Sequence, residues 1–160
     1  MMIRYFALLL FAISSFAGFS QTKKRDIKTV TEYNNTFEKG GFGKVLDRIY
    51  EYDEKGNVLK DSEYNKEGDL KGYTVCTYKG KDKLTEIEYD SKGKVVRKVV
   101  NTYNEEGLKL SETEYDAKGT VVEKHVYSYN EKGDRILRKT YDANQTLIKE
   151  KTYTYEYRDE

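Results

Sequence analysis

Tyrosine is the residue type whose number and spacing offer the most chemistry in this sequence. The chain holds 16 Tyr and no Trp, and from Tyr52 on one Tyr recurs every 11 to 14 residues. A second set stands two positions before some of these, at Tyr50, Tyr127 and Tyr153. Exposed aromatic rings on a flat sheet can stack on sugar rings or anchor a protein partner. We therefore predict that this second set binds a glycan or a protein, with packing inside the sheet as the alternative role of each ring.

Catalytic and metal-binding chemistry has few suitable residues here. One histidine, His125, and one cysteine, Cys76, cannot supply the set of about four ligands that a structural zinc site needs. His125 occupies a variable, mostly polar column, so we interpret it as a surface histidine and Cys76 as a small, partly buried apolar residue. Acid–base catalysis needs specially positioned carboxylates, but the acids recur as ordinary members of a repeat. We expect no catalytic residues, no metal, no cofactor and no enzymatic activity.

Residues 1–20 have the layout of a secretory signal peptide. Arg4 precedes an apolar run that ends at Ile13, and the small residues Gly18 and Ser20 favour cleavage after Ser20. The run is shorter than the roughly 20 apolar residues that span a bilayer. We expect residues 1–20 to be removed and residues 21–160 to form the mature domain. The protein is then exported to the periplasm or the extracellular space without a membrane span.

Charge in the mature part is abundant and balanced. Arg4 is the only charged residue among residues 1–20, so of 29 basic and 28 acidic residues in the chain, 28 of each remain. Binding to a phosphate backbone requires a basic surplus on one face, so we expect no nucleic-acid partner. Tyr, Val, Ile and Thr recur throughout, which distinguishes this composition from that of a disordered chain.

A turn signal follows most of the recurring tyrosines. Asp or Asn comes directly after Tyr, and Gly stands three positions later. Asp and Asn accept hydrogen bonds from turn amides, and Gly tolerates positive φ at the last place. Gln145 replaces this Gly after Asp142, and a different turn is expected at Lys79 to Asp82, which lacks the motif. The predicted structural turns are Asp53 to Gly56, Asn65 to Gly68, Asp90 to Gly93, Asn104 to Gly107, Asp116 to Gly119 and Asn130 to Gly133.

The segments between these turns predict strands of one antiparallel sheet. Alternate turn tyrosines lie 25 or 26 residues apart, a period that contains two strands and two turns. The segments are rich in Val, Thr and Tyr, and no proline interrupts the ladder of backbone hydrogen bonds. Their middles are charged, which argues against burial between two layers. We expect an all-β fold, a meander of about ten strands in an open, twisted, largely single-layer sheet, with a partial barrel as the alternative.

Two further expectations concern the ends of the strands. Aliphatic residues come just after each turn and Tyr just before it, so a hairpin should bring pairs such as Tyr115 and Val121 side by side. The segment from Phe37 to Gly43 contains three glycines and indicates a longer loop.

The motif Tyr-Asp-x-x-Gly-x-Val/Leu resembles the YD repeat of the Rhs and teneurin-like proteins. It stands at Tyr52-Asp53-Glu54-Lys55-Gly56-Asn57-Val58 and at Tyr115-Asp116-Ala117-Lys118-Gly119-Thr120-Val121. In that family such repeats form a long spiral of β-hairpins, often a shell around a toxic cargo, and serve binding or encapsulation. The resemblance implies a hairpin array with a binding role. We expect a non-catalytic exported repeat module that binds a glycan or protein partner through one sheet face. A scaffold role in the cell envelope is the first alternative, and an enzyme of unrecognised type is the second.

Overall fold

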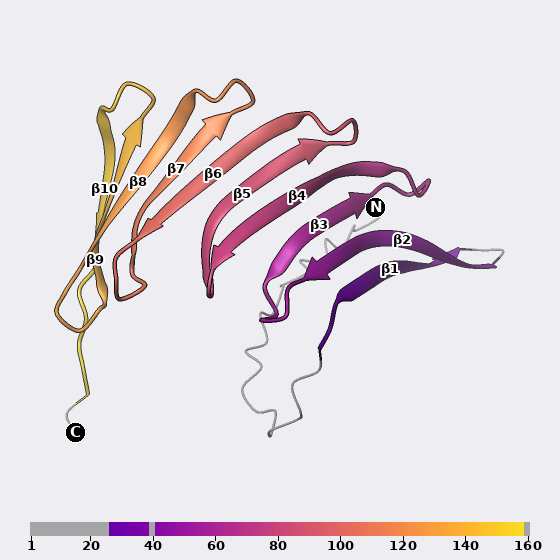
Figure 1. Ribbon diagram of the computed structural model, residues 1–160, viewed down its shortest axis with the longest axis horizontal. Helices are drawn as coiled ribbons and strands as arrows, with labels where there is room; N and C mark the ends of the chain where they lie inside the picture. The colour runs from indigo at the N-terminus through magenta and orange to yellow at the C-terminus, as the bar shows by residue number, and fades with distance from the viewer. Residues whose placement is uncertain (1–25, 39–40, 159–160) are drawn as a thin grey trace, which may run out of the picture.

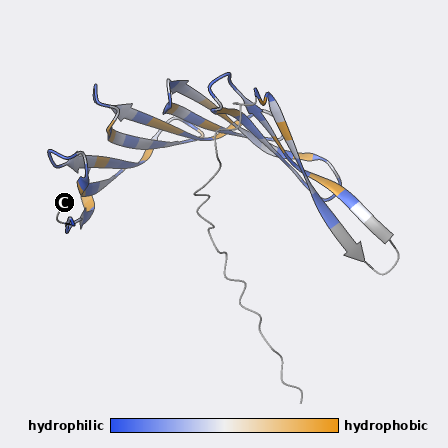
Figure 2. Ribbon diagram, turned by 90° about the horizontal axis from the view of Figure 1, so that it is seen from below, coloured by the Kyte–Doolittle hydropathy of each residue, from blue (hydrophilic) through white to orange (hydrophobic). Residues whose placement is uncertain are grey.

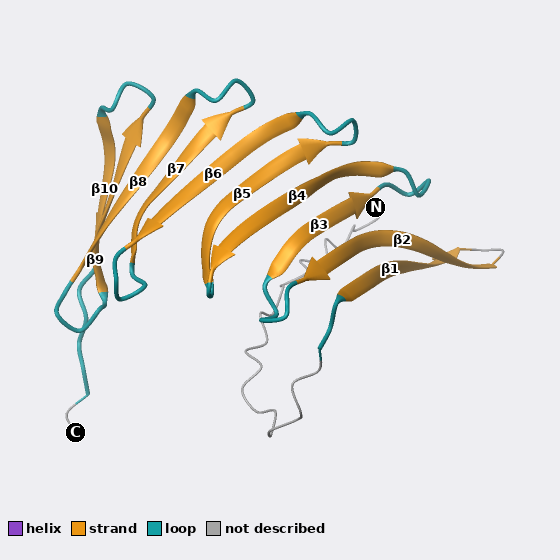
Figure 3. Ribbon diagram, viewed as in Figure 1, coloured by secondary structure: helices purple, strands orange, loops and turns teal. Residues whose placement is uncertain are grey.

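Ten antiparallel strands follow one another in the order of the sequence (Figure 1). The computed structural model describes residues 26–38 and 41–158, so the predicted signal peptide, residues 1–20, lies outside the described residues. Short turns join consecutive strands from β2 onward (Figure 3). The strands are β1 (Thr29–Glu38), β2 (Gly41–Tyr52), β3 (Val58–Tyr64), β4 (Leu70–Lys79), β5 (Asp82–Asp90), β6 (Val95–Tyr103), β7 (Lys109–Asp116), β8 (Val121–Tyr129), β9 (Arg135–Asp142) and β10 (Leu147–Thr152).

The sheet is a single open layer. Each strand contacts only the strands before and after it in the sequence, so within the described residues no second layer covers either face. The strands form one curved and twisted layer (Figure 2). The predicted open meander is confirmed, whereas the partial barrel is wrong because β1 and β10 each pair on one side only. The described residues contain no helix, and therefore none that could cross a membrane.

Each repeat turn is closed by the same hydrogen bonds. At the first one, the Gly56 amide donates to the Asp53 carbonyl at 3.0 Å, and the Asp53 amide donates to the Asn57 carbonyl at 2.9 Å. One carboxylate oxygen of Asp53 also accepts the amides of Lys55 and Asn57, each at 2.8 Å. The glycines of the predicted turns all adopt positive φ, between +79° and +88°. The structure thus has a type I turn followed by a left-handed Gly at each predicted position.

We expect Gly119→Val to lower the free energy of unfolding by about 1 kcal/mol or more, because a β-branched residue is strained at positive φ. The φ of Gly119 is +81° and an added Cβ would meet nothing within 4 Å, so the loss would report backbone strain rather than a clash. Urea unfolding followed by circular dichroism measures the change.

Gln145→Gly is the matched control for this substitution. Gln145 has a φ of +63° and is the one non-glycine residue with positive φ in the described chain. Because Gly adopts this conformation without steric cost, the replacement should raise the unfolding midpoint. Unchanged midpoints in both variants would contradict the turn geometry.

The connection between β4 and β5 differs from the repeat turns. Lys79 pairs with Asp82, which leaves a two-residue loop of Gly80 and Lys81, and Gly80 has a φ of +66°. This tight hairpin confirms that a different turn replaces the motif here. Because Gly80 also has positive φ, replacing it should strain the backbone as in the regular turns.

The connection between β1 and β2 is not the longer loop that the sequence suggested. Glu38 pairs with Gly41 and Phe37 pairs with Phe42, so both segments are strand up to residues 39–40, which lie outside the described residues. The expectation was wrong because glycines carry the backbone groups that a β-ladder needs, even without side chains to pack.

A β-bulge beside each repeat-turn tyrosine sets the register. The strand after the turn contains one extra residue, so that Val58 pairs with Tyr52 and Val121 with Tyr115. The expected cross-strand pairing of each Tyr with the aliphatic residue after its turn is confirmed for these pairs.

The turn tyrosines form two rows on opposite faces of the sheet, rather than one column. Paired residues share a face, and residues alternate between faces along a strand. Successive turns lie at opposite ends of the strands. Because all these turns have the same handedness, a turn at the opposite end places its Tyr on the opposite face of the sheet. The register places Tyr52, Tyr78, Tyr103 and Tyr129 on one face and Tyr64, Tyr89, Tyr115 and Tyr141 on the other.

Tyrosine hydroxyls link the repeats on the first of these faces. Tyr78, Tyr103 and Tyr129, and also Tyr155 after β10, each donate to a backbone carbonyl twenty residues earlier, next to the bulge of the preceding repeat. A bulge interrupts the ladder, and a carbonyl left in it needs another donor. We call this row the tyrosine ladder; its bonds are Tyr78 to Val58 at 3.0 Å, Tyr103 to Lys83 at 3.0 Å, Tyr129 to Lys109 at 2.8 Å and Tyr155 to Arg135 at 2.8 Å.

Candidate functional site

The two faces differ in charge along their middles. The face with the tyrosine ladder, here the acidic face, carries Asp61, Glu63, Glu86, Glu88, Glu112 and Glu114. The opposite face, here the lysine face, carries Lys60, Lys98, Lys124 and Lys139. Arg48 and Arg97 also lie on the acidic face, and Glu51 and Glu150 pair with Lys60 and Lys139 on the lysine face, so each face carries both signs of charge in different proportions.

The column of the second tyrosine set is most buried at its middle positions on the acidic face. Tyr127 is only 8% exposed, and Cys76 and Asn101, which replace Tyr in this column, are each 6% exposed. Tyr50 and Tyr153 are half-buried. The expectation that this column presents free rings does not fit Tyr127, because its neighbours and the Arg135 guanidinium, 4.3 Å from the ring centroid, cover it. A binding role for Tyr50 and Tyr153 stays a prediction.

Cys76 is a buried free thiol, as expected from the sequence. Burial raises the pKa of this thiol, which disfavours the reactive thiolate form.

His125 is more enclosed than a surface histidine, with 19% of its side chain exposed. Its Nδ1 lies 3.1 Å from the Thr140 hydroxyl, and its Nε2 lies 3.1 Å from a Glu123 carboxylate oxygen. Both ring nitrogens therefore have partners. In the part of the chain that the structure describes, no group of three or more His, Cys, Asp or Glu side chains is arranged to hold a metal ion.

The repeat changes its chemistry at β9. Asp61, Glu86 and Glu112 occupy equivalent places in β3, β5 and β7, and Arg138 takes that place in β9. Arg138 pairs in register with Tyr127, and Thr140 pairs with His125. The non-standard residues of the repeat thus gather on the acidic face of β8 and β9.

A hollow of about 480 Å³ opens on the lysine face between β7, β8 and β9. Tyr115 and Tyr141 line it together with Val126, Lys124 and Thr113. Neither tyrosine hydroxyl, nor the Lys124 amine, has a hydrogen-bond or ion-pair partner among the described residues. The hollow combines two rings, an apolar floor and polar groups free to bind a ligand.

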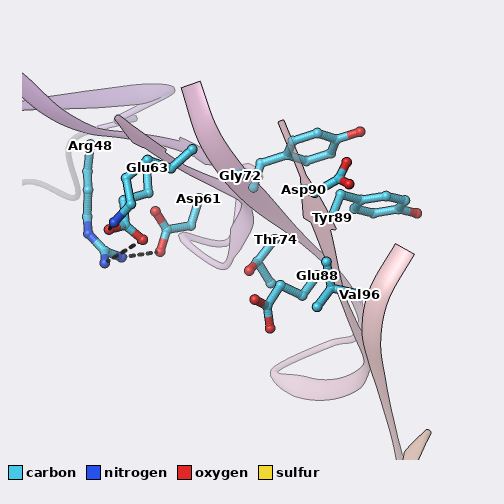
Figure 4. A pocket seen from close by; sticks show the side chains of 11 residues that line it. Arg48, Asp61, Glu63, Gly72, Thr74, Glu88, Tyr89, Asp90 and Val96 are labelled. Carbon is cyan, nitrogen blue, oxygen red and sulfur yellow. Dashed lines mark hydrogen bonds and ion pairs between the residues drawn. The ribbon is translucent and has the colours of Figure 1, made fainter. Parts of the chain in front are cut away.

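A smaller polar pocket of about 270 Å³ lies between β2 and β6 (Figure 4). It arises at Gly72, which has no side chain between its register partners Glu63 and Asp90. The Arg48 guanidinium is held by Asp61 at 2.8 Å and by Glu63 at 3.6 Å (Figure 4). Lys71 also bonds Glu63 and lowers the pKa of that carboxyl. The charges of Arg48, Asp61, Glu63 and Lys71 thus compensate one another.

No protein-family model and no curated protein matches this chain. Among solved structures, a porin-like protein from Bacteroides uniformis is 14% identical, with a TM-score of 0.45, over 80% of this chain and 51% of its own. TarM is 19% identical, with a TM-score of 0.31, over 73% of this chain and 21% of its own. A mutant of S. aureus TarM gives 18% identity and a TM-score of 0.32 over the same shares. The chain spans about half the length of the porin-like protein, and these distant likenesses carry no functional information for it.

Raising the pH above 10 should destabilise the sheet. Burial raises the pKa of Tyr78, Tyr103 and Tyr127 above the ordinary value of 10.0. The folded state therefore favours the neutral phenols, and this stabilisation is complete below pH 10 and is lost as the pH rises through the folded-state pKa. Urea midpoints at pH 8 and pH 11 measure the loss. Tyr103→Phe, which cannot ionise, should show a smaller drop, and equal midpoints at both pH values would contradict the prediction.

Sequence reasoning missed the lysine-face hollow and the change at β9. The change was open to detection, because aligning the repeats at their period of 25 or 26 residues puts Arg138 against Glu112 and Glu86. The hollow could not be detected from the sequence, because the face on which each turn Tyr lies depends on the positions of the β-bulges.

Proposed function

We propose that this protein is a non-catalytic repeat module that binds a glycan through the hollow between Tyr115 and Tyr141. The observation that carries the proposal is that these rings wall a hollow whose polar groups have no partner among the described residues. Its volume of about 480 Å³ falls within the range of about 300–1,000 Å³ for small-ligand sites.

The contrast with the acidic face supports this choice. There the hydroxyls of Tyr78, Tyr103 and Tyr129 are used to bond the backbone of the preceding repeat. On the lysine face the same kind of turn leaves the hydroxyls of Tyr115 and Tyr141 free of described partners. A ring with an apolar body and an unused hydroxyl suits the mixed apolar and hydroxylated surface of a sugar.

A glycan array followed by calorimetry on the best binder tests the proposal. The double variant Tyr115→Ala, Tyr141→Ala should bind at least about tenfold more weakly, since stacking and hydroxyl contacts are both lost. Tyr89→Ala is the matched control, because it removes a turn Tyr of the same face outside the hollow. Circular dichroism must show that all variants are folded. Equal affinity of the double variant and the control would contradict the proposal.

A scaffold role is the second candidate, and the tyrosine ladder favours it. The ladder bonds each repeat to the one before it and involves no free surface. If the folded wild-type protein retains no glycan, this reading takes precedence. Capture of a protein partner in place of a glycan by the same hollow would keep the binding role and change the ligand.

We further propose that the protein acts after export, in the periplasm or outside the cell. The proposal rests on Arg4, the apolar run and the small residues before Gln21. Mass spectrometry of the protein from its native host should find Gln21 at the N-terminus, and a mature protein that retains Met1 would contradict export by this route.

A further inference from the structure

Two repeats of the acidic face hold a cation and a carboxylate in contact at fixed positions. Lys83 lies 2.9 Å from Glu86, and Lys109 lies 2.8 Å from Glu112. In each case the Lys follows a turn directly before the bulge, and the Glu stands three residues later. The backbone therefore brings the two side chains at these places together.

The third such place carries two cations. Arg135 is equivalent to Lys83 and Lys109, and Arg138 is equivalent to Glu86 and Glu112. In the described part of the chain no carboxylate lies within ion-pair distance of either arginine, and the Nε atoms of both are buried without an acceptor. Buried N–H groups of a charged side chain without an acceptor are costly.

The surroundings add positive charge rather than an internal counter-ion. Lys151 of β10 pairs in register with Arg138. The nearby acids are already engaged, Glu112 by Lys109 at 2.8 Å and Glu123 by His125 at 3.1 Å. Tyr127 lies beneath the Arg135 guanidinium and holds it over the sheet. The place that a carboxylate fills in the other repeats is thus left without an anion.

We propose that Arg135 and Arg138 form a binding site for the oxyanion of a ligand, a carboxylate or a phosphate group. The guanidinium fork matches both groups, and a bound oxyanion would supply the negative charge that neither arginine has as an ion-pair partner among the described residues. The site lies on the face opposite the Tyr115–Tyr141 hollow, so it is independent of the glycan site proposed there. Lys151 is positioned to add a third positive charge.

Calorimetric titration of the intact protein with inorganic phosphate, and separately with glucuronate, tests this site. Arg138→Glu should weaken binding at least about tenfold, because it removes one fork and neutralises the other. The same variant should unfold at a higher temperature than the wild type, since it restores the cation–carboxylate pair of the other repeats. Binding of phosphate alone, of glucuronate alone or of both supports the site and identifies the source of the oxyanion.

Lys98→Glu is the matched control, because it makes the same change of charge on the lysine face. It should leave anion binding within about twofold of the wild type, as long-range charge effects are screened at about 0.15 M salt. Arg135→Gln, which keeps the size of the side chain better, should also lose binding and guards against misfolding of the first variant. No saturable binding to the wild type, or equal affinity in the wild type and Arg138→Glu, would overturn the proposal.

Discussion

Tyr127→Ala should destabilise the protein by about 3–5 kcal/mol, the largest loss we expect from any single side-chain truncation. Tyr127 is 8% exposed, and Arg135 covers its ring at 4.3 Å. Because no second layer exists in the described structure, few side chains are buried at all, and none of those described is less than 2% exposed. Each buried ring therefore accounts for a large share of a stability that is typically about 5–15 kcal/mol.

The repeat pattern taken alone predicts a different ranking of the tyrosines by their contribution to stability. From the repeat alone, the turn residues Tyr115 and Tyr141 are indispensable and Tyr127 is dispensable, because other repeats have Cys76 or Asn101 in its place. The structure shows instead that Cys76, Asn101 and Tyr127 are among the most buried of the described side chains. Urea unfolding of Tyr127→Ala beside Tyr115→Ala decides between the two rankings, and a smaller loss in Tyr127→Ala would restore the sequence-based one.

Gly72→Val should destabilise the protein by about 2 kcal/mol or more, through a steric clash inside the sheet. A Cβ added at Gly72 would lie 2.6 Å from the carbonyl oxygen of Tyr89, which is backbone of the neighbouring strand and cannot turn away. Strand propensity alone predicts the opposite sign, since Val is favoured over Gly in strands. The direction of the change therefore separates the two effects.

Lys79→Val is the matched control for this clash, because it introduces the same residue at an exposed position of the same strand, whose side chain has no hydrogen-bond or ion-pair partner among the described residues. Its effect should stay within about 0.5 kcal/mol, as is usual for surface substitutions. Faster amide exchange at Asp90, the register partner of Gly72, should accompany the loss in Gly72→Val. A Gly72→Val variant as stable as the wild type would show that β4 and β5 can separate locally at no cost.

The contacts between neighbouring strands also determine how far a local loss of stability extends along the sheet. Each strand touches only its neighbours in sequence, as in repeat proteins whose stability is a sum of local terms. The tyrosine ladder adds side-chain bonds between adjacent strands, such as that from Tyr103 of β6 to Lys83 of β5. We infer that each ladder bond reinforces the pairing of the two adjacent strands that it joins.

The amino-acid sequence by itself determined the strands, their order and the chemistry of their turns. The reason is that the bonds which close a turn such as Asp53 to Asn57 are all made within five consecutive residues. Asp or Asn followed three places later by Gly is enough to predict them. The absence of a second layer also followed from the sequence, because charged residues occupy the middle of both strand faces.

Only the tertiary structure decided which side chains share a face and which are buried. A bulge inserts one residue and so reverses the faces of everything beyond it in that strand, and no residue type marks a bulge uniquely. The register therefore separated Tyr103 from Tyr115 onto opposite faces, and the close approach of β5 to Gly72 appeared only with it. The pairing of Arg138 with Tyr127 was decided in the same way, since it depends on the register between β8 and β9 rather than on any local pattern.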